Sequence, residues 1–104
     1  MYSFIETRLF TRLVQDYLTD DEYRKLQFAL MENPEVGDVV PGSGGVRKLR
    51  WRAAGRGKRG GYRIIYFVKA TPRIIWMLTM YSKNETVNIP ANVLRQIREE
   101  IEND

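Results

Sequence analysis

Two runs of β-branched and aromatic residues limit the folds open to this chain. The runs are Tyr62–Val68 and Ile74–Tyr81, and only five residues lie between them. Residues of these types favour β-strands, and a short connection that contains a proline, here Pro72, favours a turn. Lys69 and Arg73 interrupt the apolar stretch as well, which argues against a membrane-spanning helix. The two runs therefore predict a pair of adjacent strands, the second apolar enough to be central in a sheet.

The segment Val46–Arg52 predicts a third strand, and its two faces differ. Leu49 and Trp51 fall on one face, whereas the other face receives three cations, Lys48, Arg50 and Arg52. Because successive side chains of a strand point to opposite faces, this alternation indicates one buried and one cationic face. Three consecutive strands joined by short loops form an antiparallel meander.

Helices are predicted on both sides of this meander. Apolar residues at helical spacing predict a helix over Thr7–Tyr17. A capping box, Thr19 to Glu22, begins a second helix, and Asn33-Pro34 ends it. Pro90 fits the first turn of a last helix.

The complete order of predicted elements is strand, helix, helix, three strands and helix. Tyr2–Glu6 fits a short first strand, and the glycines of Gly37–Gly45 predict a loop. This order predicts an α+β fold: a small antiparallel meander, an N-terminal helical hairpin over one face, and a C-terminal helix near an edge. A chain of 104 residues has room for one core, so residues 1–104 are predicted to form a single domain.

Positive charge is concentrated in one part of the chain. The segment 39–84 holds 11 of the 17 Lys and Arg residues and none of the 13 acids. Such a concentrated positive field attracts phosphate chains, whereas an ordinary solvated surface usually intersperses acids. We therefore expect RNA contacts from Arg47, Arg52, Arg56, Lys58 and Arg59. A membrane surface is a weaker candidate partner, because these cations lie in strands and a loop and not on an amphipathic helix.

The chain contains neither cysteine nor histidine. Disulfides, thiolate catalysis and cysteine metal sites are therefore excluded, and the commonest general base is missing. The start, Met1–Glu6, has no basic or sustained apolar region of the kind found in signal peptides, so we expect a cytoplasmic protein.

The loop Gly55–Gly61 carries glycines and cations together. It lacks the residue order of a P-loop and has no Ser or Thr after its lysine, which argues against nucleotide hydrolysis. It fits either an arm that grips RNA phosphates or the tip of a hairpin.

Three segments in this order resemble the RelE/HigB superfamily of toxins. They are Lys48–Arg52, Gly61–Tyr66 and Leu78–Glu85, and the resemblance spans nearly the whole chain. The sequence Gly-Gly-Val-Arg-Lys at 44–48 and the sequence Gly-Lys-Arg-Gly-Gly at 57–61 are most similar to the HigB branch.

The resemblance implies the toxin half of a toxin–antitoxin pair. Such toxins are endoribonucleases (mRNA interferases) that enter the ribosomal A site, cut the mRNA there without a metal or other cofactor, and so inhibit translation. The implied partners are the ribosome with its mRNA and a cognate antitoxin with a helix-turn-helix domain. Operator DNA would be contacted only through the antitoxin. No membrane partner is implied.

The resemblance also implies a catalytic set of positively charged residues. The family's two basic residues on the first meander strand match Lys48 and Arg50, its central-strand arginine matches Arg63, and its basic residue after the last strand matches Lys83. Tyr81 is the nearest substitute for a catalytic tyrosine found in some members.

These residue types can cleave RNA if the 2′-hydroxyl attacks the adjacent phosphate. Arginine stays charged, so it can clamp and stabilise the phosphorane but cannot transfer a proton. Lysine and tyrosine remain as proton carriers, and neighbouring cations favour neutral lysine and ionised tyrosine. We expect Lys48 or Tyr81 to be the base, Arg63 the phosphate clamp, and Lys83 or Arg50 an auxiliary group.

The sequence is also compatible with other functions and with other roles for some of these residues. A gyrase-poisoning toxin of the ParE type would share the fold, and a basic sheet with aromatic residues would also suit a non-catalytic RNA-binding module. Arg63 could instead form a salt bridge with Glu85. Four aromatic residues are expected to serve mainly in packing, namely Trp51, Tyr62, Tyr66 and Trp76, whereas Tyr81 has a better claim to stack on a base.

Overall fold

The computed structural model describes residues 1–52, 61–85 and 87–102. Its elements are, in chain order, β1 (Ser3–Glu6), α1 (Arg8–Tyr17), α2 (Asp20–Glu32), β2 (Asp38–Val39), β3 (Arg47–Trp51), β4 (Tyr62–Lys69), β5 (Ile74–Ser82) and α3 (Ala91–Glu102). The predicted order and the α+β fold are therefore confirmed, with one additional short strand.

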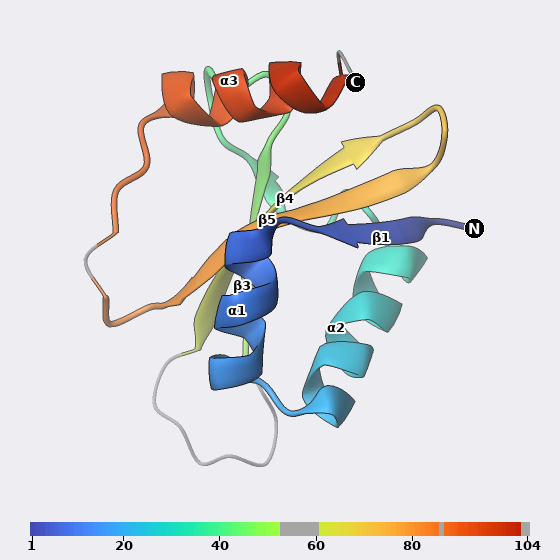
Figure 1. Cartoon of the computed structure of the whole chain (residues 1–104), viewed down its shortest axis with the longest axis vertical. Helices are drawn as coiled ribbons and strands as arrows, with labels where there is room; N and C mark the ends of the chain where they lie inside the picture. The colour runs from blue at the N-terminus through green and yellow to red at the C-terminus, as the bar shows by residue number, and fades with distance from the viewer. Residues whose placement is uncertain (53–60, 86, 103–104) are drawn as a thin grey trace.

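Within the described ranges, five strands form one sheet in the order β1-β5-β4-β3-β2 (Figure 1). The predicted meander is present, because β3 pairs antiparallel with β4 and β4 with β5. β1 pairs with β5 in parallel, so the sheet is mixed. β2 is a correction to the sequence analysis, which expected only loop over Gly37–Gly45: Asp38 and Val39 pair with Lys48 and Arg47.

Both N-terminal helices begin where capping residues predict. The Thr7 hydroxyl accepts a hydrogen bond from the Phe10 N–H and donates one to the Leu78 carbonyl of β5 at 2.6 Å, which ties the start of α1 to the sheet. At α2 the capping box between Thr19 and Glu22 is formed in both directions.

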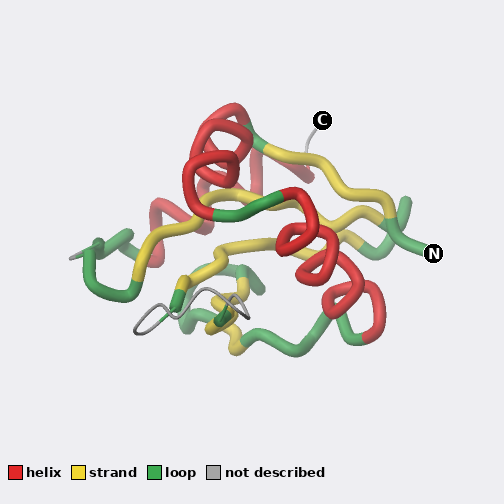
Figure 2. Tube along the Cα trace, turned by 90° about the horizontal axis from the view of Figure 1, so that it is seen from below, coloured by secondary structure: helices red, strands yellow, loops and turns green. Residues whose placement is uncertain are grey.

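The sheet has a hydrophobic core on each face. α1 and α2 cover one face (Figure 2). There Phe10, Leu26 and Leu30 pack against strand residues such as Ile64 and Tyr66. On the opposite face the residues of α3 pack against the other set of strand side chains, which comprises Val46, Ile65, Phe67 and Leu78. This last helix, which the sequence predicts near an edge, closes a second core with its buried side.

α3 covers only part of its face. The strand residues beneath it, Val46 and Phe67, lie toward the start of β3 and the end of β4. The start of β4 and the end of β5 lie at the other end of the sheet, away from α3 (Figure 1). This uncovered end of the sheet carries the candidate site.

No helix in the described part of the chain combines the length and the apolar composition that crossing a membrane would require.

Candidate active site on the cationic face

A row of three functional side chains crosses the sheet at its uncovered end. Arg50 of β3 pairs with Arg63 of β4, and Arg63 pairs in turn with Tyr81 of β5. Alternation along β4 puts Arg63 on the same face as Ile65 and Phe67, the face that α3 partly covers. Like charges directly opposite each other destabilise a sheet, so this pairing is a cost that an anionic ligand would offset.

A hollow of about 220 Å³ lies over the two arginines of this row. Among the described residues its lining includes four cations and no carboxylate; the residues are Arg50, Trp51, Arg52, Gly61, Arg63 and Lys83. Such a set of side chains can bind several phosphate oxygens at once, and a guanidinium can bind two of them.

Arg63 is half-buried in this hollow. Its Nη1 donates a long hydrogen bond of 3.5 Å to the Tyr62 carbonyl. Among the residues the structure describes, no carboxylate lies within ion-pair distance of it. The alternative of a salt bridge with Glu85 is therefore wrong, because the Glu85 carboxylate accepts hydrogen bonds from Tyr17 and Ser82 instead.

Lys48 and Tyr81 lie on the same face, Tyr81 in the arginine row and Lys48 one step closer to α3. Lys48 pairs with Ile65, one row along from the arginine pair. Both side chains line a second pocket, of about 40 Å³, which the segment 87–89 and Leu94 close from above. The two expected bases therefore share the smaller pocket, whereas Lys83, which can also transfer a proton, lines the hollow itself.

The turn after β5 carries Lys83 to the hollow. The Lys83 N–H donates to the Gly61 carbonyl at 2.9 Å, which joins the turn to the residue before β4. A Cβ on Gly61 would lie 2.6 Å from the Trp51 carbonyl oxygen, so only glycine fits between β3 and this turn. The sequence analysis did not assign a role to Gly61, although it ends a glycine-rich loop.

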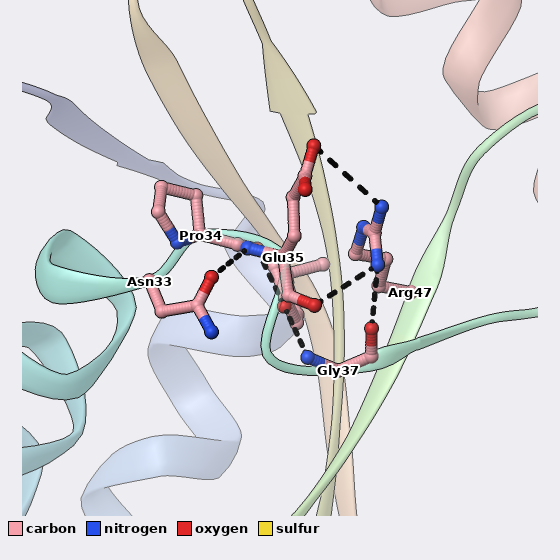
Figure 3. A network of polar contacts seen from close by, with 6 residues as sticks. Asn33, Pro34, Glu35, Gly37 and Arg47 are labelled. Carbon is pink, nitrogen blue, oxygen red and sulfur yellow. Dashed lines mark hydrogen bonds and ion pairs between the residues drawn. The ribbon is translucent and has the colours of Figure 1, made fainter.

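Arg47 lies apart from the other cations. Its side chain falls on the face of Leu49, and its Nη1 donates to the carbonyls of Glu35 at 3.1 Å and Gly37 at 2.7 Å (Figure 3). The Tyr66 hydroxyl completes this network by donating to the Pro34 carbonyl and accepting from the Gly37 N–H. The guanidinium of Arg47 thus holds the loop before β2, and the geometry disfavours the expected role in RNA binding.

A family model described as the RelE toxin of the RelE/RelB toxin–antitoxin system matches residues 4–102.

The chain belongs to the RelE toxin family.

A solved structure agrees with this assignment at the level of the fold. The E. coli toxin RelE, as an arginine double mutant in the free state, is similar with a TM-score of 0.62 and 14% sequence identity. The similarity covers 93% of this chain and 96% of that one. The RelE-like fold is therefore shared over nearly the full length of both chains.

In this RelE-family chain, most of the site residues expected from the sequence lie together. Lys48, Arg50, Arg52, Arg63, Tyr81 and Lys83 border one continuous region of the α3 face. Arg56, Lys58 and Arg59 lie outside the described residues.

The aromatic residues divide largely as expected. Tyr62 and Tyr66 are buried in the first core, and Trp76 packs against the second. Trp51 packs against the first core but also lines the hollow, and its buried Nε1 has no hydrogen-bond partner among the described residues. Within residues 1–52, 61–85 and 87–102, no group of three acidic side chains is placed to hold a metal ion.

Proposed function

We propose that this RelE-family toxin is a ribosome-dependent mRNA endonuclease that cleaves in the A site. The observation that carries this proposal is the Arg50–Arg63 pair in a hollow whose described lining holds four cations and no carboxylate. Adjacent arginines destabilise a sheet, and no described carboxylate in the hollow offsets their charge. Such a surface fits a phosphate chain. A gyrase poison would not need these cations beside two proton carriers.

The proposed reaction is an attack of the RNA 2′-hydroxyl on the adjacent phosphorus. Lys48 or Tyr81 takes the hydroxyl proton as the new O2′–P bond forms, and the P–O5′ bond then breaks. The leaving 5′-oxygen takes a proton from a second group of the site, which produces a 2′,3′-cyclic phosphate and a free 5′-hydroxyl. Both candidate bases line the smaller pocket, which also includes Leu94 of α3, and not the hollow itself.

Arg63 is the proposed clamp on the phosphorane. It occupies the middle of the row, between Arg50 and Tyr81, and has no carboxylate to compete with the phosphate among the described residues. A preorganised donor of this kind typically contributes about 10²–10³ to a rate. Arg50 and Lys83 lie on either side as auxiliary charges, and Arg52 extends the positive surface for RNA.

The proposed partners follow from the same family. A cognate antitoxin neutralises the toxin in the cytoplasm, and the similarity of residues 44–48 and 57–61 to the HigB branch favours an antitoxin with a helix-turn-helix domain. Operator DNA would then be contacted through the antitoxin. No cofactor enters the proposed chemistry.

Primer extension after brief induction tests the proposed activity. Two copies of one reporter mRNA are compared, one intact and one with its start codon removed, so that only the first is translated. We expect new 5′ ends in the translated copy alone, and none when Arg63→Ala is expressed. Growth arrest with intact reporter mRNA would overturn the proposal, and an accompanying DNA-damage response would favour gyrase poisoning.

A further inference from the structure

The Glu85 carboxylate is held by donors from two different parts of the fold. Its Oε1 accepts a hydrogen bond from the Tyr17 hydroxyl of α1 at 2.5 Å and another from the Ser82 N–H at the end of β5 at 2.7 Å. Glu85 follows Lys83 by two residues in the same turn. A helix on one face of the sheet is therefore bonded to the turn that brings a cation to the opposite face.

Tyr17 is itself fixed against β4. Its ring packs on the Tyr62 ring with the centroids 5.1 Å apart, and the Tyr62 hydroxyl donates to the Tyr17 carbonyl at 3.3 Å. Tyr62 directly precedes Arg63. The hydroxyl of Tyr17 thus has a defined position relative to the strand that carries the proposed phosphate clamp.

The other hydrogen bonds of this turn in the described residues do not reach the helices. Its backbone is joined to Gly61 by the Lys83 N–H and closed by bonds from the Glu85 N–H to the Ser82 carbonyl at 2.9 Å and from the Asn84 N–H to the Ser82 hydroxyl at 3.3 Å. Beyond Glu85 the chain leaves the sheet toward α3 (Figure 1). The side-chain bonds of Glu85 are what connect this turn to the helical layer.

We propose that Tyr17 and Glu85 act as a positioning pair, which fixes the turn at 82–85 so that Lys83 stays in the phosphate hollow. Neither residue touches the substrate, and the pair acts through Lys83. The inference rests on the proposed nuclease function, because it assigns the pair a role in that reaction. The hydrogen bond from Tyr17 also lowers the pKa of Glu85, followed in effect by the bond from Ser82, so the carboxylate stays ionised as an acceptor.

The test compares four single variants of the full chain, and the double variant Tyr17→Phe/Glu85→Ala, in single-turnover cleavage on programmed ribosomes. Tyr17→Phe removes the hydroxyl but keeps the ring on Tyr62, and Glu85→Ala removes the acceptor. Glu85→Gln still offers an oxygen to both donors. Tyr23→Phe is the matched control, because its hydroxyl also donates to a glutamate, Glu6, at 2.6 Å, but far from the turn.

We expect Tyr17→Phe and Glu85→Ala each to slow cleavage roughly tenfold, since small displacements of catalytic groups cost about that much or more. The double variant should be no slower than either single one, and Glu85→Gln should recover most of the rate. Apparent affinity for the ribosome should change less than about twofold, because the cations that bind RNA all remain. Tyr23→Phe should cleave at the wild-type rate.

Additive losses in the double variant, a loss confined to affinity, an equal loss in Tyr23→Phe, or a wild-type rate in Tyr17→Phe would each overturn the pairing. A second readout does not depend on cleavage: amide hydrogen exchange at Ser82 in the free protein. Faster exchange in Tyr17→Phe but not in Tyr23→Phe supports the pairing even if wild-type protein leaves mRNA intact, which would reject only the nuclease. Unchanged exchange at Ser82 would overturn it.

Discussion

Arg50 and Arg63 lie directly opposite each other on neighbouring strands, with their side chains on the same face of the sheet. A pair of like charges in this position works against folding. Phosphate binding would account for the pair, because two guanidinium groups side by side can bind more oxygens of one phosphate than a single group can.

Replacing Arg63 should therefore move stability and activity in opposite directions. We expect Arg63→Gln to stabilise the protein by about 0.2–1 kcal/mol, since it relieves the cross-strand repulsion. The same change should slow cleavage about a hundredfold, because the proposed clamp is lost. Urea denaturation and single-turnover cleavage measure the two effects. Arg12→Gln, an exposed cation on α1, is the control and should change neither.

Variants of Arg47 and Arg52 should distinguish a cation that stabilises the fold from one that binds RNA. Arg52→Ala should reduce the slope of log affinity against log salt by about one for ribosome binding, as expected for one lost phosphate contact. Arg47→Ala should leave that slope unchanged but destabilise the protein by about 1–2 kcal/mol, because the Glu35 and Gly37 carbonyls lose their donor. A lower salt slope in Arg47→Ala would show that this guanidinium binds RNA after all.

The buried hydroxyl of Tyr66 should contribute measurably to stability. It donates to the Pro34 carbonyl at 2.7 Å and accepts from the Gly37 N–H at 2.9 Å, and the residue is fully buried. Tyr66→Phe leaves both backbone groups without this partner, so we expect a loss of about 1–3 kcal/mol in urea denaturation. Tyr2→Phe is the control, because its hydroxyl makes no hydrogen bond within the described residues. Equal stability of the two variants would contradict the network.

Three tyrosines should ionise late in the folded protein. The hydrogen bond to Glu85, and then burial, raise the pKa of Tyr17 to about 12. Burial is the first cause of the raised pKa of Tyr23 and of Tyr66. A raised folded-state pKa means that these phenols stabilise the fold fully below the ordinary value near 10, and that this stability is lost as pH rises through the folded-state values.

Tyrosinate absorbance, followed as a function of pH, measures this directly. We expect part of the tyrosine signal to appear only well above pH ~10, and Tyr17→Phe to remove one late-titrating group. Complete ionisation near pH ~10, with the protein still folded, would contradict the raised pKa values.

Much of the site could be predicted because β-strand alternation is a local property. The pattern over Val46–Arg52 fixes which side chains share a face, and the structure confirms it: Leu49 is buried, whereas Lys48, Arg50 and Arg52 are exposed. The antiparallel pairing of β4 with β5 and the capping box at Thr19 follow from equally local signals. Family resemblance then selected the residues that share the cationic face.

The rest depends on contacts between distant segments. Tyr17 and Glu85 are 68 residues apart, and nothing in either segment shows that they meet. β2 consists of two residues, and the Tyr66 and Arg47 network holds the loop that precedes it. The same network holds the Arg47 side chain apart from the other cations, which the distribution of charge along the sequence does not reveal.

The most direct test of the nuclease account uses purified protein and ribosomes programmed with one mRNA. The fraction of mRNA cut in the A site is measured in a single turnover with the protein in saturating excess, beside Arg63→Ala as the control. The account predicts that wild-type protein cuts the bound mRNA, leaving a 2′,3′-cyclic phosphate, and that the variant cuts far more slowly. Intact mRNA on ribosomes saturated with wild-type protein would contradict it.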